Sequence, residues 1–164
     1  MSVLIVLLLQ FAVLAYAFVG GVFLAFSDFI MRSLAMTRGV GGAEAMQAIN
    51  REVFRWVFMA LFLGMAAVSL ALVAYAVFGL SGPASTMILL AGLVYLVGCF
   101  GVTVVFNVPM NNALAGMELS SDATLDYWHG TYLPRWTYWN TVRTAACAIS
   151  AALLLGGLTW MSSA

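Results

Sequence analysis

The sequence predicts an all-α integral membrane protein, a four-helix bundle forming one transmembrane domain over residues 1–164, and three observations predict this fold. Of its 164 residues, 65% are hydrophobic and only 7% are charged, whereas soluble domains carry roughly 25% charged residues. Four apolar runs are long enough to cross a bilayer: residues 3–26, 56–78, 84–106 and 140–161. The runs are continuous rather than alternating, as in membrane helices and unlike barrel strands.

The distribution of charge predicts the topology. Every charged side chain lies in or beside two segments, 27–55 and 107–143, which four spans place on the same side of the membrane. Because arginine-rich loops stay cytoplasmic, we expect a multi-pass protein of the inner (plasma) membrane with cytoplasmic long connections and both termini outside. The zero net charge gives no indication of a nucleic-acid partner.

The first connection begins with an acidic side chain at a helix end. Asp28 follows the first apolar run, and a negative charge at a helix C-terminus opposes the helix dipole. We therefore expect Asp28 to approach Arg143 or Arg55, the alternative being a solvated aspartate without such a partner.

A short interfacial helix is predicted directly before the second span. From Ala43 onward the apolar side chains recur at helical spacing, with polar and charged residues on the opposite face. Asn50 lies on the apolar side of this helix. It either bonds to neighbouring backbone or contributes to a binding site.

The third span ends in a polar stripe. Thr103, Asn107 and Asn111 are four residues apart, which places them on one face of a helix. Pro109 interrupts this stretch by removing a backbone donor and favouring a kink. The asparagines either satisfy the freed backbone groups or line a cavity.

A polar helical connection leads to the fourth span. It is followed by His129, the only histidine of the chain, and by Tyr132. At the entrance of the last span, Trp136, Asn140 and Arg143 share one helix face. They act either as interface anchors or as a functional group, because an arginine at an apolar run needs a partner.

Few residues suit metal or redox chemistry. The two cysteines, Cys99 and Cys147, lie within apolar runs, and with one histidine they form no metal-ligand pattern. They are better explained as small apolar core residues than as a redox pair. We expect no metal and no cofactor.

The polar residues near the charged membrane face can form a ring contributed by all four helices. Such a ring suits a planar, apolar aromatic molecule that carries or develops an oxyanion, such as a quinone, phenol or enol. Its members are Asp28, Arg55, Asn107, Asn111, Asn140 and Arg143, with Tyr132, Trp136 and Trp139 as aromatic walls.

Four segments together resemble the anthrone oxygenase-like family, whose members are small four-helix membrane proteins. They are Ser-Asp-Phe at 27–29, Ala-Met-Gln-Ala-Ile-Asn at 45–50, Asn-Val-Pro-Met-Asn at 107–111 and Trp-Thr-Tyr-Trp-Asn-Thr-Val-Arg at 136–143. The resemblance spans nearly the whole chain in the same order. It implies a cofactor-free oxygenation of anthrones to anthraquinones.

The resemblance also implies roles for individual residues. A base, Asp28 or His129, would remove a proton next to a carbonyl, and Arg143, Asn140 and Asn111 would hold the oxyanion. The remaining substrate-binding candidates are Asn50, Asn107, Tyr132, Trp136 and Trp139. The alternative is a non-enzymatic membrane binding or accessory protein, in which the polar cluster is structural. Besides the lipid bilayer and an aromatic small molecule, a second copy of the chain is a candidate partner.

Overall fold

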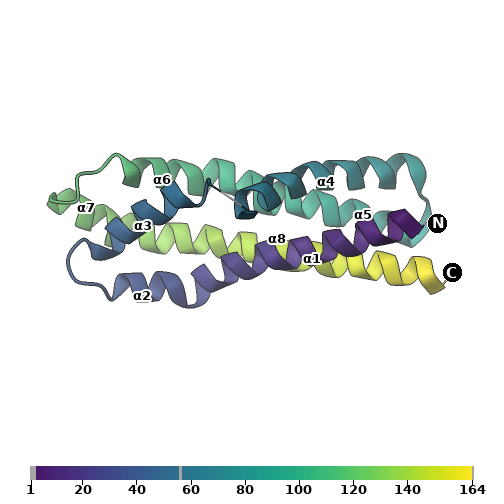
Figure 1. Ribbon diagram of the computed structural model, residues 1–164, viewed down its shortest axis with the longest axis horizontal. Coiled ribbons are helices and arrows are strands. Elements are labelled where there is room, and N and C mark those ends of the chain that lie inside the picture. The colour runs from purple at the N-terminus through teal and green to yellow at the C-terminus, as the bar shows by residue number, and fades with distance from the viewer. Residues whose placement is uncertain (1–2, 56, 164) are drawn as a thin grey trace.

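The structure, a computed structural model, describes residues 3–55 and 57–163. Trp56, the first residue of the expected second span, lies outside the described residues. Four long helices are long and apolar enough to cross a membrane: Val3–Ala35, Val57–Gly79, Gly82–Ala115 and Asp122–Ser162. They run along the long axis of the molecule (Figure 1). The predicted all-α, four-helix membrane fold is therefore confirmed.

Within the described residues, wider π-helical turns, labelled η, interrupt three of these long helices. The first comprises α1 (Val3–Ala25), η1 (Phe26–Ile30) and α2 (Met31–Ala35), and the second is α4 (Val57–Gly79). The third comprises α5 (Gly82–Val94), η2 (Tyr95–Gly101), η3 (Thr103–Asn107) and α6 (Val108–Ala115). The fourth comprises α7 (Asp122–Tyr127), η4 (Trp128–Tyr132) and α8 (Leu133–Ser163), and α3 (Gly41–Glu52) precedes the second.

The fourth long helix differs from its expected form. The polar connection and the last span are one continuous helix, although Pro134 lies between them. Inside a helix, proline removes one backbone hydrogen bond and its ring clashes with the carbonyl of the preceding turn. Pro134 is the second residue of α8, directly after the π-helical turn η4, so it lies where the regular α-helical bonding is already interrupted.

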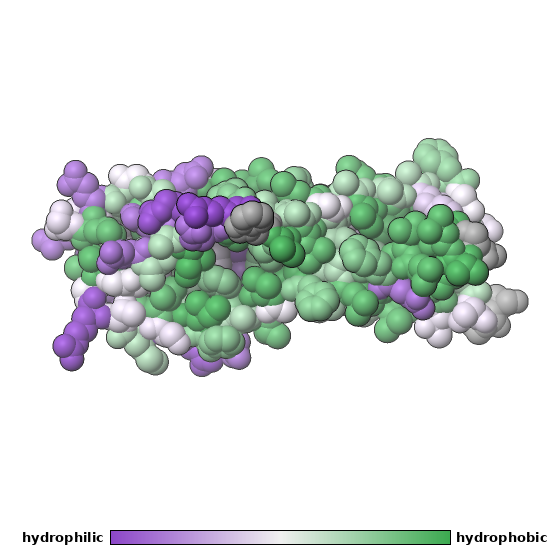
Figure 2. Space-filling model, viewed as in Figure 1, coloured by the Kyte–Doolittle hydropathy of each residue, from purple (hydrophilic) through white to green (hydrophobic). Residues whose placement is uncertain are grey.

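The two ends of the bundle differ in polarity. The chain termini and the turn between α4 and α5 lie at one end, and α2, α3 and α7 lie at the other (Figure 1). Hydrophilic surface gathers mainly around α2, α3 and α7, while hydrophobic side chains cover most of the remaining length (Figure 2). The protein is therefore a multi-pass membrane protein with its charged connections on one side. Which side faces the cytoplasm stays a prediction.

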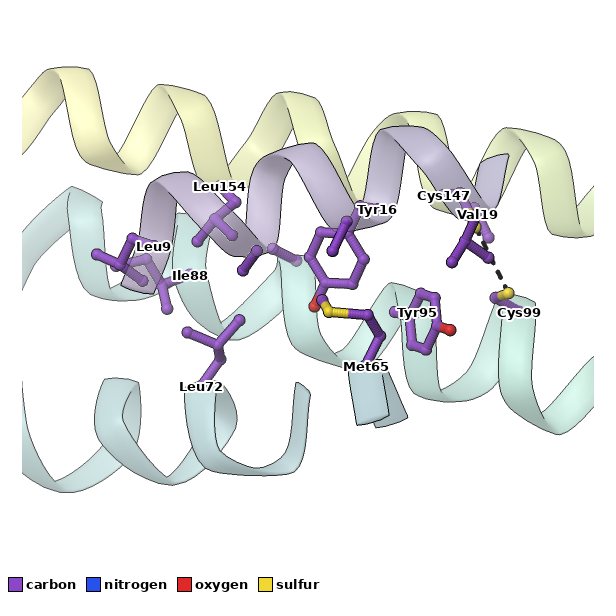
Figure 3. Close-up of a cluster of buried hydrophobic side chains, with 14 of the residues drawn as sticks. Leu9, Tyr16, Val19, Met65, Leu72, Ile88, Tyr95, Cys99, Cys147 and Leu154 are labelled. Atoms are coloured by element: carbon purple, nitrogen blue, oxygen red, sulfur yellow. Dashed lines mark hydrogen bonds between the residues drawn. The ribbon is translucent and has the colours of Figure 1, made fainter. Parts of the chain in front are cut away.

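The half of the bundle nearer the termini is packed by α1, α4, α5 and α8 around a buried apolar cluster (Figure 3). Most of its polar groups are paired: the Tyr16 and Ser69 hydroxyls lie 2.8 Å apart, and Tyr95 donates to the Phe62 carbonyl at 2.9 Å. The buried Ser150 hydroxyl of α8 is an exception and has no described hydrogen-bond partner. The Sγ atoms of Cys99 and Cys147 lie 3.5 Å apart, and both side chains are fully buried.

A second buried cluster closes the charged end of the bundle. It is formed by Met31, Ala43, Met46, Leu114, Trp128, Tyr132 and Trp136. Gln47 fixes α3 against the end of α6 by donating to the carbonyls of Leu114 at 2.8 Å and Met117 at 3.2 Å. The predicted helix before the second span is thus present. Its place at the membrane interface stays a prediction.

Candidate functional site

A cavity of about 330 Å³ lies between the two buried clusters, bordered by all four long helices and by α3. This volume is at the lower end of the range of small-molecule sites, about 300–1,000 Å³. Most of the described lining residues are aliphatic or aromatic, including Phe23, Phe62 and Trp136. Polar side chains enter the wall at few points, and these are Asn50, Thr103, Asn111 and Arg143.

Arg143 is the buried cation of this cavity, with only 4% of its surface exposed. Its Nη1 donates to Thr103 Oγ1 at 3.2 Å and its Nη2 donates to Asn140 Oδ1 at 2.6 Å. The guanidinium carbon lies 4.1 Å from the Phe23 ring centroid and 5.2 Å from that of Trp136. These are cation–π distances, so two cavity rings flank the charge.

No carboxylate neutralises Arg143 within the described part of the chain. The ion pairs found there are Asp28–Arg32 and Glu52–Arg55, and the Nε of Arg143 is buried without a hydrogen-bond partner. A buried charge without a counter-charge is strongly unfavourable in a membrane protein. The cavity wall therefore presents a positive charge that an anionic ligand atom would stabilise.

Asn140 holds Arg143 in position from behind and does not line the cavity. Its side chain is fully buried. Its Nδ2 donates to the Phe23 carbonyl at 2.6 Å and to Ser27 Oγ at 2.7 Å. With the amide nitrogen bound to the end of α1, the amide oxygen faces Arg143. Asn140 thus joins α8 to α1 and directs the guanidinium.

The amide of Asn111 is oriented by two donors. Its Oδ1 accepts from Tyr132 Oη at 2.7 Å and from Trp136 Nε1 at 2.8 Å. Because an indole N–H can only donate, the oxygen of this amide must face Trp136. The Nδ2 group then points away from both aromatic residues, and Asn111 lines the cavity, so this wall offers a further N–H donor.

Tyr132 connects Asn111 to α3. Its hydroxyl accepts from Asn50 Nδ2 at 3.3 Å while it donates to Asn111. Its ring stacks between Trp128 and Trp136, at centroid distances of 5.4 and 6.0 Å. The π-helical turn η4 carries Trp128 and Tyr132 into this stack. Tyr132 therefore supports the cavity wall without lining it.

Two other predicted binding residues lie outside the cavity. Asn107 is buried and donates to the Trp136 carbonyl at 3.3 Å, while its Oδ1 lacks a described partner. Trp139 stacks face to face on Phe106, with ring centroids 3.6 Å apart, beside a separate surface hollow. Asn107 links the third and fourth long helices, and Trp139 packs against the outside of the same pair.

The predicted pairing of Asp28 with Arg143 or Arg55 is wrong. Asp28 binds Arg32, one turn further along the same helix, at 3.1 Å, and Arg55 binds Glu52 at 3.2 Å. All four side chains are mostly exposed. A partner within one turn is available in each case, and exposed charges do not require a buried one. The solvated alternative for Asp28 describes the structure.

The second candidate base is also remote from the cavity. His129 is exposed and lies beside a surface hollow formed by α2 and α8. Neither Asp28 nor His129 lines the cavity that contains Arg143. In the described residues, no group of three histidine, cysteine, aspartate or glutamate side chains is placed to hold a metal ion.

Sequence reasoning missed most of the apolar walls. Phe23, Phe58, Phe62 and Phe100 line the cavity, but each belongs to a run that is apolar on all faces. Such a run does not indicate which face points inward. The sequence did indicate a role for Thr103, because this residue begins the polar stripe of the third span. Its bond to Arg143, however, depends on how two helices pack.

The model of the family described as anthrone oxygenase matches residues 50–153 of the chain. The matched region contains every polar side chain that lines the cavity. A search of curated proteins and a search of solved structures each found no match. Because the family model covers more than half of the sequence, the chain belongs to the anthrone oxygenase family.

Proposed function

We propose that this protein binds a planar phenolic or anthrone-type aromatic compound in the cavity and oxygenates it with O2. One observation carries the proposal: Arg143 is buried at the wall of an apolar cavity and has no described carboxylate partner. A neutral apolar ligand would leave this charge uncompensated, whereas an enolate or phenolate would pair with it. Family membership supports the oxygenase chemistry.

Apart from a proton acceptor, the proposed reaction consumes only substrate and O2. The substrate carbon opposite the carbonyl loses a proton, and the electron pair delocalises onto the carbonyl oxygen as an oxyanion. The carbanion form adds O2, and the resulting peroxide anion takes up a proton to give a hydroperoxide at that carbon. Loss of water from the peroxide leaves one oxygen atom as the new carbonyl group. The second oxygen atom departs in the water, together with the two hydrogens of the original methylene carbon.

The protein's contribution is electrostatic. Arg143 and the Asn111 amide present N–H donors to the substrate oxygen, where negative charge increases as the proton leaves. Such fixed donors stabilise a developing oxyanion better than mobile water does, by on the order of 3 kcal/mol for one donor, or about a hundredfold in rate. The rings of Phe23 and Trp136 flank the guanidinium and would contact the flat face of the substrate.

We propose a water molecule as the proton acceptor. The described cavity lining contains neither a carboxylate nor an imidazole, so the main effect of the site is to make the bound substrate more acidic. Asp28 and His129 remain the alternative bases. Substitution of each distinguishes these routes.

A second function is favoured by the same lining. A site without an acid or base of its own also suits a membrane protein that binds an aromatic anion without transforming it. This binding protein would keep the interactions of Arg143 and Asn111 and would show no oxygen consumption. Turnover separates the two functions.

The test uses purified protein in lipid nanodiscs with an anthrone as substrate. Oxygen uptake and quinone absorbance are measured for wild type, Arg143→Lys and, as a matched control, Arg135→Lys, an exposed arginine of the same helix. We expect a loss of about a hundredfold for Arg143→Lys, because an ammonium cannot reproduce the planar guanidinium fork. We expect Arg135→Lys to resemble wild type. Equal turnover by all three proteins would contradict the proposal.

A further inference from the structure

The cavity is walled by apolar side chains that are themselves exposed on the outside of the bundle. Val22 of α1, Leu63 of α4 and Val104 of η3 line it, yet their exposed fractions are 40%, 50% and 51%. Phe54, just after α3, lines it too and is 64% exposed. Residues that face both the cavity and the exterior mark its mouth. The mouth is therefore apolar and lies beside α4.

The mouth lies at membrane depth. At a rise of about 1.5 Å per residue, Val22 is about 29 Å from the start of α1 and Leu63 about 24 Å from the end of α4. Both helix ends lie at the uncharged end of the bundle (Figure 1). The hydrocarbon core of a bilayer is about 30 Å thick, so the mouth opens near the boundary between hydrocarbon and headgroups on the charged side.

The central route from the charged end of the bundle is blocked by packed side chains. Met46, Trp128, Tyr132 and Trp136 form the buried cluster there, and each is at most 4% exposed. The bonds from Gln47 to the end of α6 fix α3 over this cluster. Among the residues that the structure describes, no comparable buried cluster covers the mouth beside α4.

We propose that the cavity takes its ligand sideways from the bilayer, as an amphiphilic aromatic whose oxygen-bearing ring enters and whose apolar substituent stays in the lipid. The orientation follows from the positions of the charges: Arg143 is the deep end of the cavity and the apolar residues Leu63 and Val104 form its outer end. The substrate class is thus a ring with a hydrocarbon tail opposite the oxyanion. This inference rests on the proposed function in one respect, namely that Arg143 binds the anionic oxygen of the ligand.

Binding of a stable oxyanion tests this without turnover. The probes are a hydroxynaphthoquinone, which is a coloured enolate at neutral pH, and its homologue with a long alkyl chain on the ring. Affinity is expressed relative to the probe concentration in the nanodisc lipid. We expect wild type to bind both within about threefold, because the tail remains in an apolar medium throughout.

Blocking the mouth provides the second arm. Val104→Trp and Leu63→Trp should each slow association of both probes by about tenfold in rapid-mixing absorbance measurements. Val97→Trp is the matched control, since Val97 lies in the same long helix, is 70% exposed and lines none of the described cavities. We expect it to bind as wild type does.

Each outcome decides between the proposals. Sideways entry would be overturned if only the alkylated probe bound weakly. It would also be overturned if the association rates were equal for Val104→Trp, Leu63→Trp and Val97→Trp. Either result would leave the oxygenase proposal standing. If both probes bind and the two mouth variants slow association as expected, but an anthrone causes no oxygen uptake, the entry route stands and the oxygenase function is rejected. Failure of wild type to bind either probe would overturn both.

Discussion

The two halves of the bundle use polar side chains in opposite ways. Near the termini, the hydroxyls of Tyr16, Ser69 and Tyr95 are buried and bonded to one another or to backbone carbonyls. Nearer the charged end, Arg143 and Asn111 are held by neighbours but retain unused donors beside a cavity. Apart from the Ser150 hydroxyl, the buried polar side chains described in the first half are bonded within the protein, whereas the unused donors of Arg143 and Asn111 border a cavity.

This difference shows how to separate structural from functional polar groups in a membrane bundle. Both halves contain buried polar atoms, so burial alone does not identify a site. The distinguishing feature is unused hydrogen-bonding capacity next to a cavity. Unpaired polar groups in an apolar environment are unfavourable, so they are retained mainly where a function requires them. Substitutions in the two halves should therefore affect different properties.

The largest effect is expected at Arg143. Arg143→Met removes the charge while keeping an apolar side chain in its place, so oxygenation should fall by at least about a hundredfold. Thermal unfolding in detergent should be unchanged or shifted upward, since replacing buried charge by apolar groups is often neutral or stabilising. If Arg143→Met instead unfolds at a much lower temperature and keeps its turnover per folded molecule, the role of Arg143 is structural.

The packed half should respond in stability instead. A Cβ atom at Gly92 would lie 2.7 Å from the Ser69 carbonyl oxygen, where α4 meets α5. Gly92→Ala should therefore reduce the free energy of unfolding by about 1–3 kcal/mol. A Cβ at Gly64 meets nothing within 4 Å, so Gly64→Ala is the control and should be nearly neutral. Equal stability of the two variants would show that this half is less tightly packed than described.

A matched pair of tyrosines sharpens the comparison. Tyr132→Phe removes one of the two donors that orient Asn111, so turnover should fall about fivefold, the equivalent of about 1 kcal/mol. Tyr16→Phe removes a hydroxyl that contacts only Ser69 among described partners, and should lower stability by about 1 kcal/mol without changing turnover per folded molecule. If both variants changed turnover by the same factor, the claim that polar side chains have different roles in the two halves would be wrong.

The smallest effects are expected at the two remote candidate bases. Asp28→Asn breaks an exposed ion pair, and such pairs contribute about 0–1 kcal/mol to stability. His129→Gln alters an exposed side chain outside the cavity. Turnover of both variants should remain close to wild type if water accepts the proton. A loss of about a hundredfold in either would identify that residue as the base.

The sequence was sufficient for the four membrane helices, because long apolar runs determine them locally. It also singled out Asn111, Asn140 and Arg143, since polar residues beside apolar runs are uncommon. It could not show that Asn140 stands behind Arg143, because this depends on the rotation of α8 against α1. Nor could the sequence show that Asp28 is solvated. Both Arg32 and Arg143 could serve as its ion-pair partner, and only the packing of the helices decides between them.

The helix α4 illustrates the same limit. Ala60, Gly64 and Ala67 suggest a packing surface by their spacing, yet all three are exposed. The face that packs inward carries Phe62 and Met65. Because this helix is apolar on every side, hydrophobic periodicity holds no information about its rotation.

The central claim is that Arg143 and Asn111 hold the substrate as an oxyanion, and the ionisation state of a bound anthrone tests it most directly. The absorbance of an anthrone is recorded with excess protein in nanodiscs without oxygen, at a pH where the free compound is in its neutral keto form. We expect the spectrum of the enolate with wild type and that of the neutral compound with Arg143→Met. A bound anthrone that stays neutral with wild type, or an enolate that persists with Arg143→Met, would contradict the account.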